Sequence, residues 1–182
     1  MALIVGIIFT LLTIAARLVP HIPNIAPVAA LALFAGVYLP KKWSIILPVL
    51  AMLVSDIFIG FYQWEVMVAV YVGFILTVLI GWQVRKGVNP GTVLGGSLGG
   101  SVIFFLLTNA AVWLFTQMYA HTLPGLLDSY VMALPFFKFS ILGDLAWTAV
   151  FFTAYQAAIA RFPKINLEKL STVDSVSPNG IH

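Results

Sequence analysis

Six long apolar runs occupy most of this chain and limit what it can fold into. A helix that crosses a lipid bilayer needs about 20 mainly apolar residues, and the backbone of such a segment must satisfy its own hydrogen bonds, which favours helices. Only 8% of the 182 residues are charged, against about 25% in a typical soluble domain. The sequence therefore predicts an all-α, polytopic membrane protein with six transmembrane helices. The runs are Ala2–Val19, Ile25–Leu39, Trp43–Gly60, Trp64–Val84, Val93–Tyr119 and Pro135–Ile159.

Two segments break this pattern. The second run is short and carries Pro23 and Pro27 at its start, so we expect it to enter the membrane as an irregular segment. The stretch Ala120–Leu134 is too polar to span a membrane and too apolar for an ordinary loop, and we expect a short helix there that lies on the outer surface as a lid. Residues 1–162 then form one transmembrane domain, and residues 163–182 form a polar cytoplasmic tail.

The positive charges predict the orientation of the chain. Cytoplasmic connections of membrane proteins are enriched in Lys and Arg. With both termini inside, the outer connections hold only Lys138, and Arg17 lies near the outer end of the first helix. The basic balance thus reports orientation and contact with the lipid bilayer, and we expect no nucleic acid partner. The inner cations are Lys41, Lys42, Arg85, Lys86, Arg161, Lys164 and Lys169.

Arg17 is the costliest residue to place in a membrane. An Arg at a helix centre costs roughly 2.5–3.5 kcal/mol, and less near an end from which it can reach the interface. Arg17 shares a polar stripe at helical spacing with Thr10 and Thr13. It can extend to the interface, pair with Asp56, or contact an anionic group of a ligand. His21 continues the stripe in a rigid turn, where it is either solvated or a ligand for a metal centre within a substrate.

Polar groups of three other helices gather toward the same outer side. Asp56 and Asp144 are intramembrane carboxylates, which are rare and usually paired or exposed to water. For Asp56, pairing with Arg17 and direct ligand contact are both open, and one arrangement can serve both. Asn109 is followed at helical spacing by Trp113, which places an amide beside an aromatic plane, as in a binding wall. The alternative for Asn109 is hydrogen bonding between helices.

Glycine and aromatic patterns have structural explanations. The run Gly95–Gly99 matches the Gly-x-Ser-x-Gly pattern, but a hydrolase nucleophile needs a strand-to-helix turn and a nearby base, and Ser97 starts an inner-side helical run. Two pairs, Gly95 with Gly99 and Gly96 with Gly100, have the small-xxx-small spacing that lets helices approach closely. Tyr62 fits the aromatic belt at the outer interface. The chain has no cysteine, which excludes thiolate metal sites and nucleophiles, and we expect no catalytic residue, metal or cofactor of its own.

Several motifs together resemble a known pattern. They resemble a family of uncharacterised six-helix bacterial membrane proteins. That pattern is similar to the substrate-binding S-components of energy-coupling-factor (ECF) vitamin transporters, and especially to the solitary cobalamin transporters of the BtuM-like group. The motifs that carry this resemblance are Arg17–Asn24, Pro27–Gly36, Met52–Asp56 with Gly60 and Phe61, Thr108–Trp113, and Ala133–Phe137 with Gly143 and Asp144.

The resemblance implies an S-component-like monomer, with both termini inside, that binds a vitamin near its outer face and reorients to deliver it inward. Such proteins usually work with an energising membrane subunit and two ATPases. Two features depart from the family. The docking motif Ala-x-x-x-Ala of the first helix is only Ala2-x-x-x-Gly6 here, which argues against docking on an ECF energising module. The cobalt-ligating cysteine of the BtuM-like group is missing, which leaves His21 as a substitute contact.

The leading expectation is a non-enzymatic uptake protein of the bacterial cytoplasmic (inner) membrane for a small water-soluble vitamin or cofactor, with cobalamin as the best candidate. One alternative is an intramembrane enzyme that acts on a lipid or isoprenoid with Asp56 or Asp144 as acid or base. Another is a non-catalytic scaffold subunit of a membrane complex. The substrate-binding residues that we expect are Arg17, His21, Asn24, Asp56, Asn109, Trp113, Phe136 and Asp144.

Overall fold

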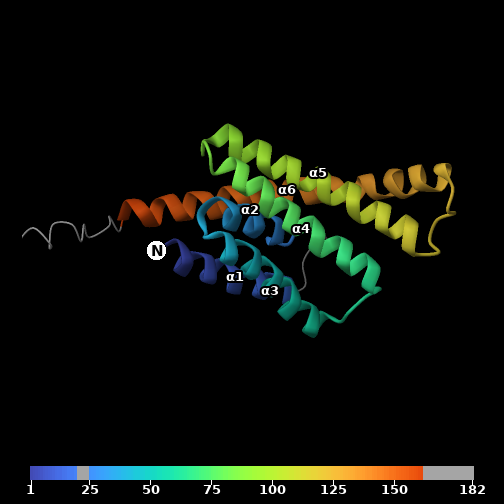
Figure 1. The fold of residues 1–182 in the computed structure, drawn as a ribbon, viewed down its shortest axis with the longest axis horizontal. Helices are drawn as coiled ribbons and strands as arrows, with labels where there is room; N and C mark the ends of the chain where they lie inside the picture. The colour runs from blue at the N-terminus through green and yellow to red at the C-terminus, as the bar shows by residue number, and fades with distance from the viewer. Residues whose placement is uncertain (20–24, 162–182) are drawn as a thin grey trace, which may run out of the picture.

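The computed structural model describes residues 1–19 and 25–161, and their regular secondary structure consists of six helices. The predicted all-α fold is therefore confirmed, and one helix corresponds to each of the six predicted apolar runs. Two expected site residues, His21 and Asn24, and the predicted tail over 163–182 lie outside the described residues. The helices are α1 (Ala2–Leu18), α2 (Val28–Tyr38), α3 (Lys41–Ile59), α4 (Trp64–Val84), α5 (Pro90–Phe115) and α6 (Leu123–Arg161), shown in Figure 1.

Helix length and surface chemistry are those of a membrane protein. Four helices, α3 to α6, are long and apolar enough to cross a membrane, whereas α1 has 17 residues and α2 only 11. Large apolar side chains point outward over much of the surface, as Ile4 at 65% exposure and Phe58 at 72% illustrate. Lipid covers an apolar surface of this extent far more favourably than water does.

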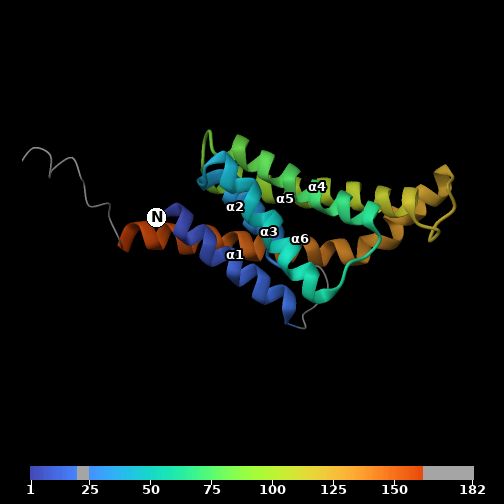
Figure 2. The ribbon, with the colours of Figure 1, turned by 60° about the horizontal axis from the view of Figure 1, so that its bottom comes forward.

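The short helix α2 is the centre of the bundle. Apart from Ala29, every residue from Val28 to Val37 is buried, and α2 packs against each of the other five helices. Such a helix is apolar on all sides because it has no face toward water. The rings of Phe34 in α2 and Phe9 in α1 meet edge to face at 4.9 Å. The remaining helices surround α2 in the spatial order α1, α3, α4, α5 and α6 (Figure 2).

Two contacts fix the C-terminal end of α2. A Cβ atom added at Gly81 of α4 would lie 2.7 Å from the Leu33 carbonyl oxygen and 2.8 Å from the Gly36 Cα, so the two backbones touch. Arg85 then caps α2: its Nε donates to the Gly36 carbonyl oxygen at 3.0 Å, and its Nη2 donates to the carbonyl oxygens of Gly36 and Leu39. A cation at a helix C-terminus is favourable because the last carbonyls carry partial negative charge.

The glycine pairs of α5 meet the expectation in part. Gly96 packs closely on α4, where an added Cβ would lie 2.8 Å from the Val84 side chain, and Gly100 packs on Thr77. An added Cβ at Gly95 meets nothing within 4 Å. The pair Gly96 and Gly100 is therefore the closely packed one, whereas an added Cβ at Gly99 would come no nearer than 3.9 Å, to the Ile80 side chain.

The observed starts of α5 and α6 differ from the predicted ones, and the expected lid is not a separate helix. α5 begins at Pro90 behind a capping box, in which Asn89 and Thr92 exchange hydrogen bonds of 3.0 Å. α6 runs unbroken for 39 residues from Leu123 and includes Pro135. The separate surface helix predicted over Ala120–Leu134 is therefore wrong, because most of that stretch forms the first turns of α6. An interior proline removes only one backbone donor, which membrane helices tolerate.

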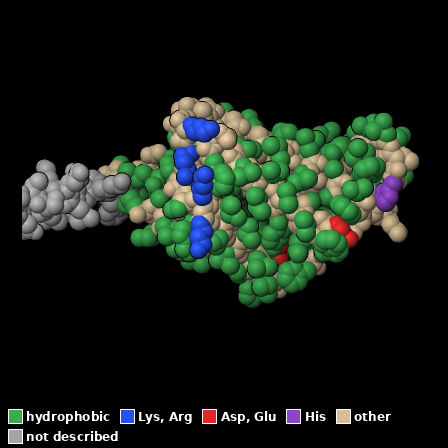
Figure 3. Space-filling view, viewed as in Figure 1, with side chains coloured by type: hydrophobic (Ala, Val, Ile, Leu, Met, Phe, Trp, Pro, Cys, Tyr) green, Lys and Arg blue, Asp and Glu red, His purple; other side chains and the backbone are tan. Residues whose placement is uncertain are grey.

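The cations gather at one end of the bundle. Figure 3 shows Lys and Arg side chains in a band across the molecule, near the starts of α3 and α5. We call this the cationic end and define it by Lys41, Lys42, Arg85 and Lys86. The other end, where α1 and α3 finish, is called the distal end. Lys138 differs from the expectation, because it lies exposed within α6 and not in a connection.

Candidate functional site

The shortness of α2 positions a cavity inside the bundle. Its 11 residues rise about 16 Å, whereas the hydrocarbon core of a bilayer is about 30 Å thick. Because α2 ends at the cationic end and is much shorter than α3 to α6, it begins inside the bundle, between the cationic end and the opposite end. A cavity of about 250 Å³, which we call the central cavity, lies at its N-terminus. All six helices contribute to the lining, through residues such as Arg17, Val28, Met52, Phe74, Phe104 and Asp144.

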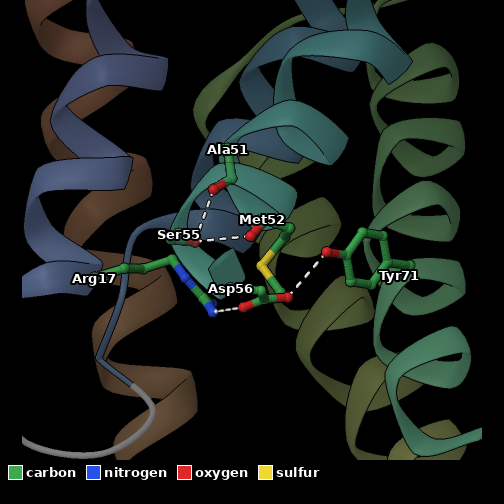
Figure 4. Close-up of polar contacts among 6 residues, drawn as sticks. All are labelled: Arg17, Ala51, Met52, Ser55, Asp56 and Tyr71. Atoms are coloured by element: carbon green, nitrogen blue, oxygen red, sulfur yellow. Dashed lines mark hydrogen bonds and ion pairs between the residues drawn. The ribbon is translucent and has the colours of Figure 1, made fainter. Parts of the chain in front are cut away.

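Arg17 and Asp56 form an ion pair beside this cavity (Figure 4). The Arg17 Nη2 lies 2.6 Å from the Asp56 Oδ1, and the side chains are 16% and 1% exposed. The second carboxylate oxygen accepts a hydrogen bond of 2.9 Å from the Tyr71 hydroxyl. The neighbouring Ser55 instead donates to carbonyl oxygens of its own helix. The pairing of Arg17 with Asp56, one of the alternatives drawn from the sequence, is the arrangement that the structure shows.

Arg17 keeps a donor beyond this pair. Its side chain lines the central cavity, and its Nε is buried without a hydrogen-bond partner among the described residues. Most buried polar atoms are hydrogen-bonded, and an unsatisfied donor costs about 1–3 kcal/mol. The guanidinium therefore holds Asp56 with one nitrogen, while a second nitrogen has no partner among the described residues and the side chain lines the cavity.

The N-terminus of α2 adds backbone donors to the same cavity. Val28 and Ala29 line it, and the N-cap residue Pro27 supplies no side-chain cap to the first N–H groups. The Trp147 indole fixes the preceding segment by donating to the Ile25 carbonyl oxygen at 2.8 Å. Because the N-terminus of a helix carries partial positive charge, half-helices that begin at mid-depth in membrane proteins bind anionic groups.

Asp144 joins the central cavity to a second one. A side cavity of about 230 Å³ lies between α5 and α6, and both cavities are lined by Phe104, Ser140 and Asp144. Asp144 is 7% exposed, and its Oδ2 accepts a hydrogen bond of 2.6 Å from the Ser101 hydroxyl. Asp144 lies near the middle of α6, because this helix begins at Leu123 and not at the predicted Pro135.

The other expected site residues divide into two groups. Asn109 and Phe136 line the side cavity, and the Asn109 amide also donates to the Phe105 carbonyl oxygen of its own helix at 2.8 Å. Trp113 lines neither cavity. Its indole donates to the Ala120 carbonyl oxygen at 2.9 Å and so holds the connection between α5 and α6. The structure thus gives Trp113 a role in the fold and leaves the aromatic lining to other residues.

Several residues that line the cavities could hardly be predicted from the sequence. Phe74 and Phe104 face each other across α4 and α5 with ring centroids 4.7 Å apart. Tyr62, expected in an aromatic belt, lines the central cavity. Partial burial and the negative charge of Asp56 raise the pKa of Tyr62 to about 12, so its hydroxyl stays protonated at neutral pH and can donate. Ser101 had one usable signal, which is its spacing of four residues from Ser97.

One family of proteins matches this chain over most of its length. The model of DUF6580, described as a family of unknown function, matches residues 1–165. The chain belongs to this family. No curated protein and no solved structure matches this DUF6580 protein. The matched range contains all six helices and the lining of both cavities. Residues 1–19 and 25–161 of this DUF6580 protein contain no group of three or more His, Cys, Asp or Glu side chains that could hold a metal ion.

Proposed function

We propose that this protein is a substrate-binding membrane transport protein that takes up a small water-soluble vitamin or cofactor. The observation that carries the proposal is the central cavity, which all six helices line with charged, hydroxyl, aromatic and aliphatic groups. Ligand sites are typically apolar cavities with a few convergent polar groups. Ionisable residues that face a cavity inside a membrane protein mark solute pathways.

The lining indicates the chemistry of the ligand. A carboxylate or phosphate group fits beside Arg17 and the first N–H groups of α2, since both supply donors and positive potential. Phe74 and Phe104 offer aromatic surface for a planar ring. Ser140 adds a hydroxyl group to the same lining. We therefore propose a planar, anionic or zwitterionic solute.

The volumes favour a ligand smaller than cobalamin. The central and side cavities measure about 250 and 230 Å³, whereas pockets for drug-sized ligands span about 300–1,000 Å³. Cobalamin greatly exceeds a drug-sized molecule, so its entry requires the helices to move apart. Among vitamins, we rank anionic compounds with a single ring system first and cobalamin second.

The proposed setting is the bacterial cytoplasmic membrane, with the cationic end inside and the cavity loaded from the distal, outer side. An ECF energising module is not part of the proposal. Gly6, the second position of the docking-type motif, is buried, and an added Cβ there would lie 2.9 Å from the Leu39 side chain and 3.3 Å from that of Leu47. This small-residue face of α1 is therefore occupied within the chain.

Native mass spectrometry and calorimetry with a panel of water-soluble vitamins test the proposal. We expect one vitamin to bind, and we expect the double substitution Arg17→Gln/Asp56→Asn to weaken its affinity at least about tenfold, which is about 1.4 kcal/mol. Removing both charges avoids a lone buried charge, so this variant should still fold. Trp113→Phe, outside both cavities, is the control and should bind normally. Absence of any binding vitamin, or normal affinity in the double variant, contradicts the proposal.

A further inference from the structure

Asp144 is a buried carboxyl group without a cationic partner among residues 1–19 and 25–161. The Arg17 guanidinium, which lines the same cavity, is paired with Asp56. An unpaired carboxylate at mid-depth in a membrane is costly, and the group avoids that cost when it carries a proton. Asp144 also lines both cavities, so its carboxyl group can contact a solute or an ion that enters either of them.

The elements around Asp144 supply no compensating charge. Helices α5, α2 and α1 pack against α6. α5 has no ionisable side chain, α2 has only Tyr38 at its last position, and α1 has only Arg17. Across the central cavity lie the neutralised Arg17–Asp56 pair and two tyrosines, Tyr62 and Tyr71. On α6 itself, Lys138 is exposed and its Nζ lies over the Phe139 ring at 4.9 Å.

The hydroxyl group of Ser101 can serve Asp144 in either protonation state. Its Oγ lies 2.6 Å from the Asp144 Oδ2 and 3.0 Å from the Ser97 carbonyl oxygen. A hydroxyl has one hydrogen to donate and can also accept. When Asp144 is ionised, Ser101 donates to the carboxylate. When Asp144 is protonated, the acid donates to Ser101, whose hydrogen turns to the Ser97 carbonyl oxygen. The hydrogen bond between Ser101 and the Asp144 Oδ2 is thus kept in both states without a movement of heavy atoms.

Polar side chains continue from Asp144 toward the cationic end. The hydroxyl groups of Ser97 and Thr148 lie 3.3 Å apart, one helical turn beyond the Ser101–Asp144 contact. Thr148 lines a groove of about 500 Å³ at the cationic end, together with Asn89 and Gln156. Asp144 therefore lies between the central cavity on its distal side and the groove on its cationic side. The hydroxyl groups of Ser97 and Thr148 lie between Asp144 and the groove.

We infer that Asp144 is a proton-binding site that couples proton entry to solute uptake through the central cavity. The inference rests on the proposed transport function and supplies its energy source. A proton from the outer side binds the Asp144 carboxylate and changes its charge from −1 to 0. After the protein opens inward, the proton leaves to the cytoplasm and Ser101 again donates to the carboxylate. A proton fits better than a hard metal cation, which prefers about six oxygen ligands.

Infrared titration of the full chain in lipid vesicles, with the proton as the probe, tests the binding site. We expect a C=O stretching band of a protonated carboxyl group that titrates with pH and disappears in Asp144→Asn. The matched control, Asp128→Asn, changes an exposed carboxyl of the same helix and should keep the band. Ser101→Ala should shift the frequency of the band because the hydrogen-bond partner is lost. A band that survives Asp144→Asn, or ignores Ser101→Ala, overturns the inference.

Proteoliposomes with an internal pH dye test the coupling. We expect a mixture of the water-soluble vitamins, added outside, to acidify the interior, and we expect Asp144→Asn to abolish the acidification while Asp128→Asn preserves it. If the vitamins enter without acidification, or if Asp144→Asn still acidifies, coupling at Asp144 is refuted and uptake stands. If no vitamin binds or enters, the proposed function fails, while the infrared titration still decides whether Asp144 binds a proton with Ser101 as partner.

Discussion

At the scale of single residues, Asp56 determines whether Arg17 can remain inside the bundle. The carboxylate neutralises the guanidinium with one oxygen and accepts the Tyr71 hydroxyl with the other. Because Asp56 is 1% exposed, water cannot take over either contact. The pair therefore fixes α1 against α3 and orients Arg17 at the edge of the central cavity.

Loss of Asp56 should be strongly destabilising. Breaking a buried ion pair by removal of one partner typically costs about 3–5 kcal/mol, because the other charge stays buried and uncompensated. We expect Asp56→Ala to lower the free energy of unfolding by about that amount, measured by denaturant titration in mixed micelles. Ser55→Ala is the matched control, since Ser55 donates only within its own helix, and it should change stability by less than about 1 kcal/mol. Equal effects of the two substitutions would contradict this role.

The sequence could reveal Arg17 and Asp56 but not most of the cavity lining. A charge in an apolar run must be paired or exposed to water, so its presence alone predicts a partner. Phe104 and Met52 carry no such cost, and nothing in an apolar helix tells a cavity-lining Phe from a lipid-facing one. Ser101 offered only its spacing of four residues from Ser97, which does not predict a contact with Asp144, because a serine hydroxyl can always bond to its own helix.

At the scale of helices, the contact of α2 with α4 depends on one glycine from each helix. Gly36 and Gly81 let the two backbones touch, and this contact holds α2 at the centre of the bundle. The sequence patterns emphasised paired glycines on α5 instead. A single glycine per helix has no spacing signature, so this contact could not be predicted from the chain alone.

Gly81→Ala should therefore destabilise the bundle. The added methyl group would lie 2.7 Å from the Leu33 carbonyl oxygen, and overpacking of this kind costs about 1–3 kcal/mol. Gly95→Ala is the matched control, because its methyl group would meet nothing within 4 Å and alanine favours helix by up to about 1 kcal/mol. Thermal unfolding in detergent should show a lower Tm for Gly81→Ala and an unchanged or higher Tm for Gly95→Ala. The opposite order would show that α2 and α4 can separate freely.

Helix boundaries were predictable where polarity changes abruptly. The bounds of α4, Trp64–Val84, agree with the prediction, because polar residues flank a continuous apolar run. The start of α5 was missed because hydropathy does not register a capping box such as that of Asn89. The start of α6 was missed because Pro135 resembles a helix start, whereas the helix begins 12 residues earlier, at Leu123.

At the scale of the whole molecule, a half-length central helix within a ring of longer helices explains both the packing and the cavity. The cationic half of the ring is filled by α2, and the distal half retains space that polar side chains line. The segregation of charge then decides which side of the membrane that space faces (Figure 3). Under the proposed function, the charged loops would determine the side from which the cavity is loaded, whereas the helices form the cavity itself.

Single cysteines can test this orientation without background, because the chain contains none. Met118, in the connection between α5 and α6, is 70% exposed, and Val88, in the connection between α4 and α5, is 41% exposed. We expect a membrane-impermeant maleimide to label Met118→Cys in intact cells, and Val88→Cys only after permeabilisation, because Arg85 and Lys86 hold that connection inside. The reverse pattern would place the distal end in the cytoplasm. The central cavity would then be loaded from the cytoplasm, and the proposed function would have to be export of the solute instead of uptake.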